Sequence, residues 1–169
     1  MQLLVIRHAI AADPAPEGDD ASRPLTRKGI RRFRLCVRGM SRLDMRLGAV
    51  LHSPWTRAAA TAELLRPLRD RDAPHLATSL LCQSPGPELL AQLAELGARP
   101  EAARLAAAVV GHEPFLGELI GLLTAGTASA GEGLELKKGS VTVLRGSAVA
   151  GGMTLCALLP PRALRELAR

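Results

Sequence analysis

Aromatic residues are the scarcest class in this 169-residue chain: Phe, Trp and Tyr together make up 2% of it, and Tyr is absent. Proteins that bind single-stranded nucleic acids stack the bases on aromatic side chains, so this composition argues against that class. The net charge is +6, but the basic residues are spread along the chain rather than gathered in one run. Such a charge also suits acidic or phosphorylated partners. Nucleic-acid binding therefore stays a hypothesis that rests on charge alone, behind the two alternatives given at the end of this subsection.

Cysteine is also rare, and its three positions, Cys36, Cys82 and Cys156, are far apart and form no CxxC pair. An odd number of cysteines at these spacings argues against a disulfide framework and against a zinc site. We predict that each cysteine acts as a small apolar residue. A reactive thiol at Cys82, which falls near a loop of the site predicted below, is the alternative.

Long apolar runs are missing as well. No run approaches the ~18 residues that a membrane-spanning helix needs, and the longest covers residues 105–110. Near the N-terminus, four apolar residues are followed at once by Arg7, which is not the pattern of a signal-peptide core. We therefore expect a cytoplasmic protein without membrane contact. The length favours one domain over residues 1–169.

The hydrophobic fraction of 47% is enough for a core, and its pattern alternates between strands and helices. Strands are predicted at residues 3–6, 49–51, 76–81 and 105–110, followed by a hairpin of 141–144 and 153–159. Helices are predicted between them and after Pro160-Pro161, and residues 11–23 and 124–135 are predicted as loops. This order predicts an α/β fold: a three-layer α/β/α sandwich whose mostly parallel central sheet carries an antiparallel C-terminal hairpin at its edge.

Two helix starts carry recognisable capping signals. Thr26 is a predicted N-cap, and apolar residues recur after it at helical spacing while most of the arginines between residues 31 and 38 fall off that stripe. We interpret those arginines as a solvated helix face. Ser53 is predicted to cap a second helix, with Pro54 in the first helical position and the helix continuing to Leu68. A third helix is predicted to end at Gly97.

Arginine and histidine residues lie at or just after the ends of several predicted strands. Arg7 and His8 end the first strand, Arg57 lies in the first turn after the second, and His112 ends the fourth. Ligands of open α/β sheets bind at the carboxyl ends of the parallel strands, where helix N-termini also favour anions. Each residue alone has a plainer explanation, as a surface or capping histidine or a helix-surface arginine. Their joint placement is what points to a site.

Arginine and histidine at one sheet edge suit phosphate chemistry. The guanidinium group presents a fork of donors that matches phosphate oxygens. Imidazole is nucleophilic when neutral and stabilises anions when charged. The other histidines have different predictions: His52 as a partly buried core residue and His75 as a surface residue. Arg23, before Pro24, is either a further contact to the substrate or simply the point where loop joins helix.

Four motifs follow one another along the chain: the Leu-Leu-Val-Ile-Arg-His run ending at His8, Arg23–Thr26 with Gly29, Ser53–Ala58 with Thr61 and Ala62, and Val109–Pro114. In this order and at this spacing they resemble those of the histidine phosphatase superfamily, which has the phosphoglycerate-mutase-like fold. The resemblance extends to its short bacterial branch, the SixA-type phosphohistidine phosphatases. It implies that His8 is a nucleophile forming a phosphohistidine intermediate, that Arg7 and Arg57 hold the phosphoryl oxygens, and that His112 stabilises the transition state. It implies no metal and no cofactor.

The sequence departs from the family pattern in two places. Ala9 stands where the family usually has glycine, so a methyl group could restrict the backbone or narrow the pocket. The acid that larger members carry after the third strand is also missing; the nearest carboxylate is Glu88, with the loop residue Asp13 as another candidate. A phosphorylated imidazole leaves without a strong enzymic acid, whereas an alkoxide needs one. We therefore expect a protein phosphohistidine substrate. A small-molecule phosphomonoesterase and a non-catalytic phosphate-binding or scaffolding module remain the alternatives.

Overall fold

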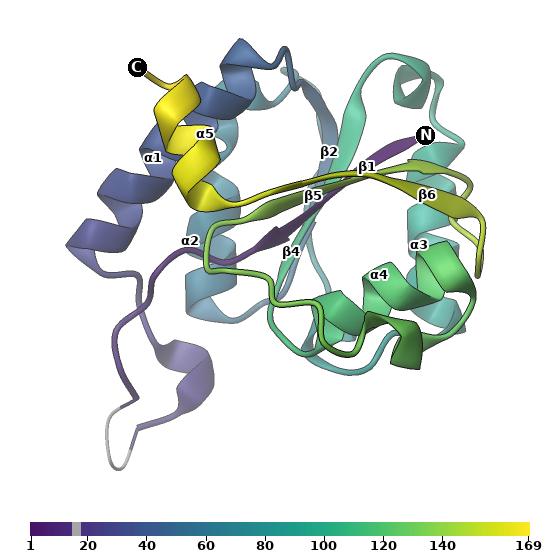
Figure 1. Cartoon of the computed structure of the whole chain (residues 1–169), viewed down its shortest axis with the longest axis horizontal. Coiled ribbons are helices and arrows are strands. Elements are labelled where there is room, and N and C mark those ends of the chain that lie inside the picture. Colours follow the sequence, from purple (N-terminus) through teal and green to yellow (C-terminus); the bar gives the residue numbers. More distant parts are fainter. Residues whose placement is uncertain (15–17) are drawn as a thin grey trace.

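A mixed six-stranded sheet forms the centre of the protein, a computed structural model of which describes residues 1–14 and 18–169 (Figure 1). The strand order is β3-β2-β4-β1-β5-β6. The strands β1 to β4 run parallel, while β5 pairs antiparallel with β1 and β6 pairs antiparallel with β5. The predicted parallel sheet with a C-terminal hairpin at its edge is therefore confirmed. The strands are β1 (Gln2–Arg7), β2 (Leu47–His52), β3 (His75–Ala77), β4 (Ala106–Gly111), β5 (Val141–Gly146) and β6 (Met153–Leu159).

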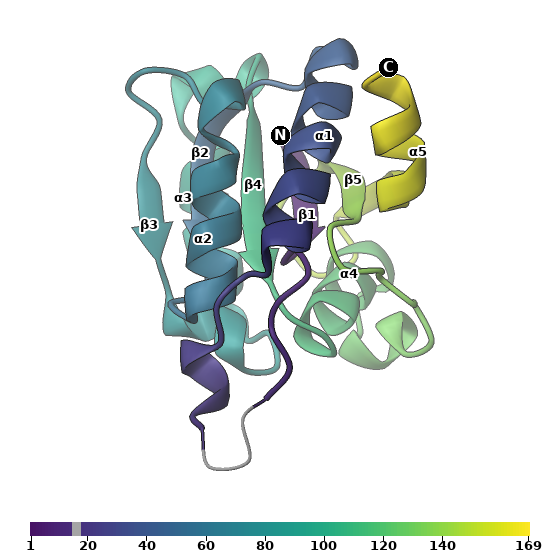
Figure 2. The same cartoon turned by 90° about the vertical axis from the view of Figure 1, so that its left-hand side faces the viewer.

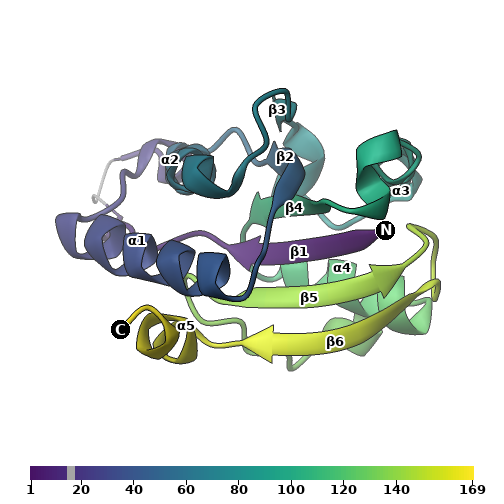
Figure 3. The same ribbon diagram turned by 90° about the horizontal axis from the view of Figure 1, so that it is seen from above.

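Helices cover both faces of this sheet, as seen from above in Figure 3. In β1, Leu4 and Ile6 pack into the core on the side of α1, α2 and α5, while Leu3 and Val5 pack on the side of α3 and α4. Successive side chains of a strand point to opposite faces, so a central strand buried on both must be apolar throughout. The helices are α1 (Arg27–Arg42), α2 (Thr56–Leu64), α3 (Pro87–Gly97), α4 (Phe115–Ala125) and α5 (Pro161–Leu167).

Helix α1 begins where the sequence predicted. The Thr26 hydroxyl accepts a hydrogen bond from the Gly29 N–H at 2.9 Å, which satisfies one of the free donors of the first turn. Gly29 also has a packing role, because a Cβ atom there would lie 2.1 Å from the carbonyl oxygen of Ile10. The helix therefore lies against the segment that follows β1. The arginines of α1 between residues 31 and 38 are exposed, as expected for a solvated face.

The second predicted helix is wrong at both ends. The helix α2 begins at Thr56 rather than at Pro54, and the Ser53 hydroxyl, which was predicted to cap it, belongs to the site described below. The helix ends at Leu64, and a separate 3-10 turn, η2 (Arg66–Leu68), follows. Pro67 explains this break, since its ring cannot continue an α-helix.

The third predicted strand is also shorter than expected. Only His75–Ala77 pair with β2, and residues 79–82 form a 3-10 helix, η3 (Ser79–Cys82), in which the Thr78 hydroxyl accepts from the Leu80 N–H. Leu76 is half exposed, because β3 is an edge strand. Apolar composition alone does not distinguish such a turn from a continuing strand.

Two segments predicted as loops contain short helical turns. The first includes η1 (Asp20–Ser22), which lies below the carboxyl ends of the parallel strands and next to α2 in Figure 2. Residues 15–17 of that predicted loop, with Pro16, lie outside the described residues. The second begins after α4 and includes η5 (Ala128–Gly131). Within residues 1–14 and 18–169, no helix combines the length and apolar character needed to cross a membrane.

Candidate functional site

The polar residues predicted at the strand ends lie together. Arg7 is paired with Gly111 in the β1–β4 register, so His8 and His112 leave the sheet side by side, and their ring centroids are 5.1 Å apart. Arg57 reaches them from the first turn of α2. All four residues line one cavity of about 400 Å³. Arg23 lines it as well, together with Asp20, Trp55, Glu113, Pro114, Phe115 and Lys138.

The hydrogen bonds of His8 fix which of its ring nitrogens is free. Its Nδ1 lies 2.7 Å from the carbonyl oxygen of Ala9, which can only accept, so Nδ1 carries the proton. The lone pair is therefore on Nε2, to which the Arg57 Nε–H donates at 3.3 Å. Burial, together with the charges of Arg57, Arg7 and Lys138, lowers the pKa of His8 to about 4. At neutral pH the ring is uncharged, and Nε2 is a nucleophilic nitrogen within the cavity.

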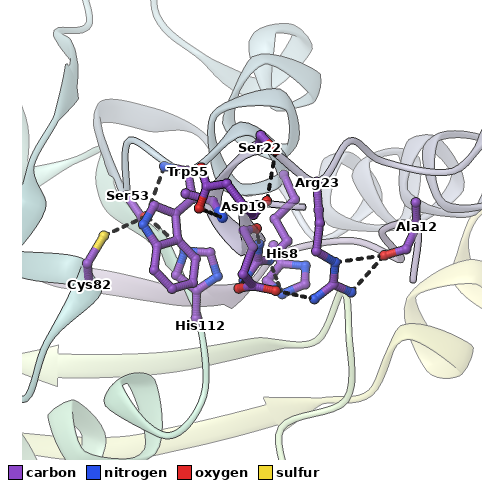
Figure 4. Close-up of polar contacts among 12 residues, drawn as sticks. His8, Ala12, Asp19, Ser22, Arg23, Ser53, Trp55, Cys82 and His112 are labelled. Carbon is purple, nitrogen blue, oxygen red and sulfur yellow. Dashed lines mark hydrogen bonds and ion pairs between the residues drawn. The ribbon is translucent and has the colours of Figure 1, made fainter. Parts of the chain in front are cut away.

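One ring nitrogen of His112 is hydrogen-bonded to a serine. The Ser53 hydroxyl lies 2.8 Å from His112 Nε2, accepts from the Trp55 N–H at 3.2 Å and lies 3.1 Å from Cys82 Sγ (Figure 4). The Trp55 N–H donates to the serine oxygen, so the serine hydroxyl donates in one of the two other contacts and its oxygen accepts in the remaining one.

The other ring nitrogen of His112, Nδ1, is buried and has no hydrogen-bond partner among the described residues. Burial, with His8 and Arg57 nearby, lowers the pKa of His112 to about 3, so the ring is neutral at pH 7 and carries one N–H. When the serine hydroxyl donates to Nε2, that N–H is on Nδ1, and a buried donor without a partner costs about 1–3 kcal/mol. In this tautomer His112 can donate one hydrogen bond, from Nδ1, to a ligand oxygen.

Two arginines of the cavity, Arg57 and Arg23, form ion pairs with a carboxylate from η1. Asp20 Oδ2 lies 2.7 Å from Arg57 Nη2, and Oδ1 lies 2.6 Å from Arg23 Nη1. These two arginines lower the pKa of Asp20 below its ordinary value, so the carboxylate is ionised at neutral pH. The Arg57 guanidinium also lies 4.6 Å from the centre of the Trp55 ring, a cation–π contact. Asp20 thus occupies donors that an anionic ligand would use.

Arg7 and Arg23 differ in how many of their donor groups are hydrogen-bonded within the protein. Arg7 donates through Nη1 to the carbonyl oxygen of Leu136, and its Nε is buried without a partner in the described chain. Arg23 donates from Nε and Nη2 to the carbonyl oxygen of Ala12, at 2.8 and 2.7 Å (Figure 4). Arg23 therefore lines the cavity and joins the two ends of the loop that precedes α1, while its contact with a substrate stays a prediction.

Several residues of the cavity were not singled out from the sequence. Ser53 was predicted as a helix cap, Trp55 stood in the Ser53–Ala58 motif without a role of its own, and Asp20 and Lys138 carried no signal. Glu113 was visible only as the neighbour of His112.

Glu113 is the acid that lines the cavity beside the histidines. Burial raises its pKa, its Oε2 accepts from the Gly117 N–H at 3.3 Å, and its Oε1 is buried without a partner among the described atoms. Glu88 and Asp13, the acids considered from the sequence, are exposed and do not line the cavity.

Ala9 does not narrow the cavity. Its side chain is 2% exposed and packs in the core on the side of α1 and α2. Its N–H donates to the Thr61 hydroxyl at 3.0 Å, and its backbone lies outside the left-handed region. Alanine is therefore accommodated without backbone strain.

Two further histidines lie away from the cavity. His52 is buried, as predicted, and its ring packs against that of His75 with centroids 4.7 Å apart. His75 lies on the edge strand β3 with its side chain 27% exposed, so it is a partly exposed surface residue. Over residues 1–14 and 18–169, no group of three or more histidine, cysteine or acidic side chains is placed to hold a metal ion.

Comparison with known proteins gives one sequence relative and many similar folds. No protein-family profile matches the chain. The protein SYNPCC7002_A2622 of Picosynechococcus sp. is 35% identical over 148 residues, which are 88% of this chain and 87% of that protein, so the two belong to one family.

Among solved structures, the protein histidine phosphatase SixA, complexed with tungstate, superposes with a TM-score of 0.76 at 23% identity, covering 97% of this chain and 99% of SixA. The alpha-ribazole phosphatase of Shigella flexneri gives a TM-score of 0.66 at 21% identity over 95% and 97% of the two chains. A phosphoserine phosphatase of Entamoeba histolytica gives 0.64 at 15% identity over 96% and 98%. At these identities the likeness concerns the fold.

Proposed function

We propose that this chain, whose fold is that of SixA and of an alpha-ribazole phosphatase, is a histidine phosphatase working through a phosphohistidine intermediate on His8. The observation that carries the proposal is the state of His8. Its neutral ring holds a lone pair on Nε2 inside a cavity lined by Arg7, Arg57 and His112. A nucleophile facing a cluster of phosphate-binding donors is what in-line phosphoryl transfer requires.

In the first step, His8 Nε2 attacks phosphorus. The new N–P bond forms as the bond between phosphorus and the leaving group breaks, and the leaving atom departs with the electron pair. Arg7 and Arg57 donate to the phosphoryl oxygens, and His112 Nδ1–H donates to a third oxygen position. These fixed donors stabilise charge on the transferring group without reorganising during the reaction.

In the second step, water attacks the phosphorus of phosphorylated His8. The N–P bond breaks, its electron pair returns to Nε2, and both protons of the water leave with the inorganic phosphate as H2PO4⁻. Because Nδ1 keeps its hydrogen bond to the Ala9 carbonyl throughout, the ring returns to the tautomer in which it began. Asp20 must give up Arg57 for substrate to bind, so its carboxylate competes with the phosphoryl group for the same donor.

Phosphohistidine in a protein is the substrate we propose. An imidazole that is already protonated leaves as a neutral group and needs no strong acid from the enzyme. The carboxylate nearest the arginines, Asp20, is ionised and unsuited to donate a proton.

A small phosphomonoester is the second candidate, and one observation favours it. Glu113 lines the cavity with a raised pKa and a buried, unpartnered oxygen, so it could protonate an alkoxide leaving group. General acid catalysis of this kind contributes about 10²–10⁴-fold.

Turnover of matched substrates separates the candidates. We expect kcat/KM for a phosphohistidine peptide to exceed that for phosphoserine or a sugar phosphate by roughly 10²-fold or more. This is the loss of rate expected when no general acid protonates an alkoxide leaving group. Glu113→Gln should leave phosphohistidine hydrolysis unchanged. Faster cleavage of phosphoesters, lost in Glu113→Gln, would favour the phosphomonoesterase. If no phosphate is released from any of these compounds, the chain is a non-catalytic phosphate-binding module.

A further inference from the structure

A second and larger hollow lies directly beside the cavity that contains His8, which is called the phosphoryl cavity below. This groove, of about 640 Å³, is bounded by the start of α1, the segment 135–139 before β5, and the start of α5. Figure 2 shows α1 and α5 side by side, with the chain leading into β5 passing next to them. Arg7 and Lys138 line both the groove and the phosphoryl cavity. The groove and the cavity that contains His8 therefore adjoin at these two residues.

The groove combines an apolar base with a cationic rim. Ile10, Pro160 and Pro161 contribute apolar surface, while Arg32 on α1 and Lys137 on the opposite side carry charges. Arg162 and Arg165 add to the positive side, against one carboxylate, Glu135.

These charges are largely free of partners within the protein. In the described parts of the chain, Arg32, Lys137 and Lys138 make no ion pair, and both Arg32 and Lys137 are exposed. Arg162 pairs with Glu166 at 2.9 Å, but both side chains are exposed, and such surface pairs contribute little. The groove therefore presents a surplus of positive charge that the fold itself does not use.

We propose that this groove binds an acidic segment of a phosphoprotein, next to the phosphorylated residue that enters the cavity. The proposal rests on the proposed function, because it names the class of substrate that the same site would take. Carboxylates of the segment would face the cations on both sides, and its apolar side chains would lie on the base. Complementary charge of this kind speeds encounter and selects partners.

A peptide fits this surface better than a nucleic acid does. Sequence-tolerant binding of single strands depends on exposed aromatic rings that stack on the bases. Phe33 is the one aromatic residue lining the groove among the described residues, and it is 1% exposed. A ring this deeply buried offers no face for stacking.

The test compares two peptides that differ only in flanking charge. One carries a single histidine flanked by Asp and Glu, and the other has Asn and Gln in their place; each is used phosphorylated on histidine and unphosphorylated. The variant is Arg32→Glu with Lys137→Glu. Its matched control is Arg34→Glu with Arg38→Glu, which makes the same charge change on exposed residues of α1 outside the groove. Free phosphohistidine, which is too small to reach the groove, reports the integrity of the cavity.

For the wild type we expect kcat/KM on the acidic peptide to be roughly tenfold above that on the neutral peptide at low salt, with the difference shrinking as salt rises. The groove variant should lose this preference and keep its turnover of free phosphohistidine, while the control variant should keep both. Equal kcat/KM for the two peptides in the wild type, or equal loss in both variants, would overturn the proposal.

Binding of the fluorescently labelled, unphosphorylated peptides separates this proposal from the phosphatase proposal. If no substrate is turned over but the acidic peptide still binds the wild type more tightly than the neutral one, and the groove variant loses that difference, the groove stands and the proposed activity fails. A single-stranded oligonucleotide that displaces the acidic peptide and binds more tightly than it, with the same dependence on Arg32 and Lys137, would overturn the peptide assignment in favour of nucleic acid.

Discussion

The neutral state of the two buried histidines makes the stability of this protein depend on pH in a defined direction. Burial and neighbouring charges lower the pKa of His8 from 6.5 to about 4. Above pH 6.5 the ring is neutral in both the folded and the unfolded chain. Between pH 6.5 and about 4, the unfolded chain binds a proton that the folded chain does not, so the free energy of unfolding decreases as the pH falls.

The size of this effect follows from the two pKa values. Each pH unit in the window removes about 1.4 kcal/mol, so His8 alone should remove about 3 kcal/mol between pH 7 and pH 4. Domains are stable by about 5–15 kcal/mol, so this loss is a large fraction of the total. His112, with its pKa lowered to about 3, acts in the same direction.

Urea unfolding from pH 7 to pH 4, in buffer free of phosphate, measures this dependence. We expect the loss of unfolding free energy to be smaller by about 3 kcal/mol in His8→Gln than in the wild type, since glutamine does not titrate. The chain has four histidines, so NMR can follow each imidazole directly. If the His8 resonance titrated near pH 6.5, or if both proteins lost stability equally, the account of the buried neutral nucleophile would be refuted.

Three further substitutions test individual contacts of the cavity. Ser53→Ala removes the group that orients His112, so it should lower kcat roughly 10–100-fold with little change in KM. This is the loss expected when one hydrogen bond to the transition state is weakened. An unchanged kcat would contradict that role. Asp20→Asn frees Arg57 of its ion pair, so inorganic phosphate should inhibit at a severalfold lower concentration; unaltered inhibition would mean that Asp20 does not compete. Ala9→Gly removes a buried methyl and adds chain freedom, so it should destabilise by about 1 kcal/mol in thermal unfolding and leave kcat unaltered; a marked rise in kcat would mean that the methyl does obstruct the site.

The architecture could be predicted because the chain repeats one pattern. Apolar runs buried on both faces alternate with amphipathic stretches, and that alternation permits few folds. The place of the cavity followed from the same pattern. Arg7 ends β1, His8 and His112 directly follow β1 and β4, and Arg57 lies in the first turn of the helix after β2. The carboxyl ends of parallel strands meet at one edge, so residues distant in sequence had to converge there.

What the sequence could not supply are contacts that exist only between distant segments. Ser53 carries an ordinary capping signal, yet its hydroxyl is used by His112, 59 positions away in the chain. Asp20 comes from a loop with several acids, and only the folded chain shows which of them reaches Arg57. Glu113 was overlooked because acids were sought after the third strand, where the family pattern puts them.

The central claim is that His8 Nε2 forms a covalent bond to phosphorus, and trapping that species tests it most directly. The protein is mixed with a phosphohistidine peptide, quenched with detergent at alkaline pH to preserve the acid-labile N–P bond, and analysed by peptide mass spectrometry. We expect a phosphorylated peptide that carries His8 in the wild type, and neither phosphorylation nor turnover in His8→Ala. Phosphate release by His8→Ala at the wild-type rate, or a trapped phosphoryl group on any other residue, would contradict the account.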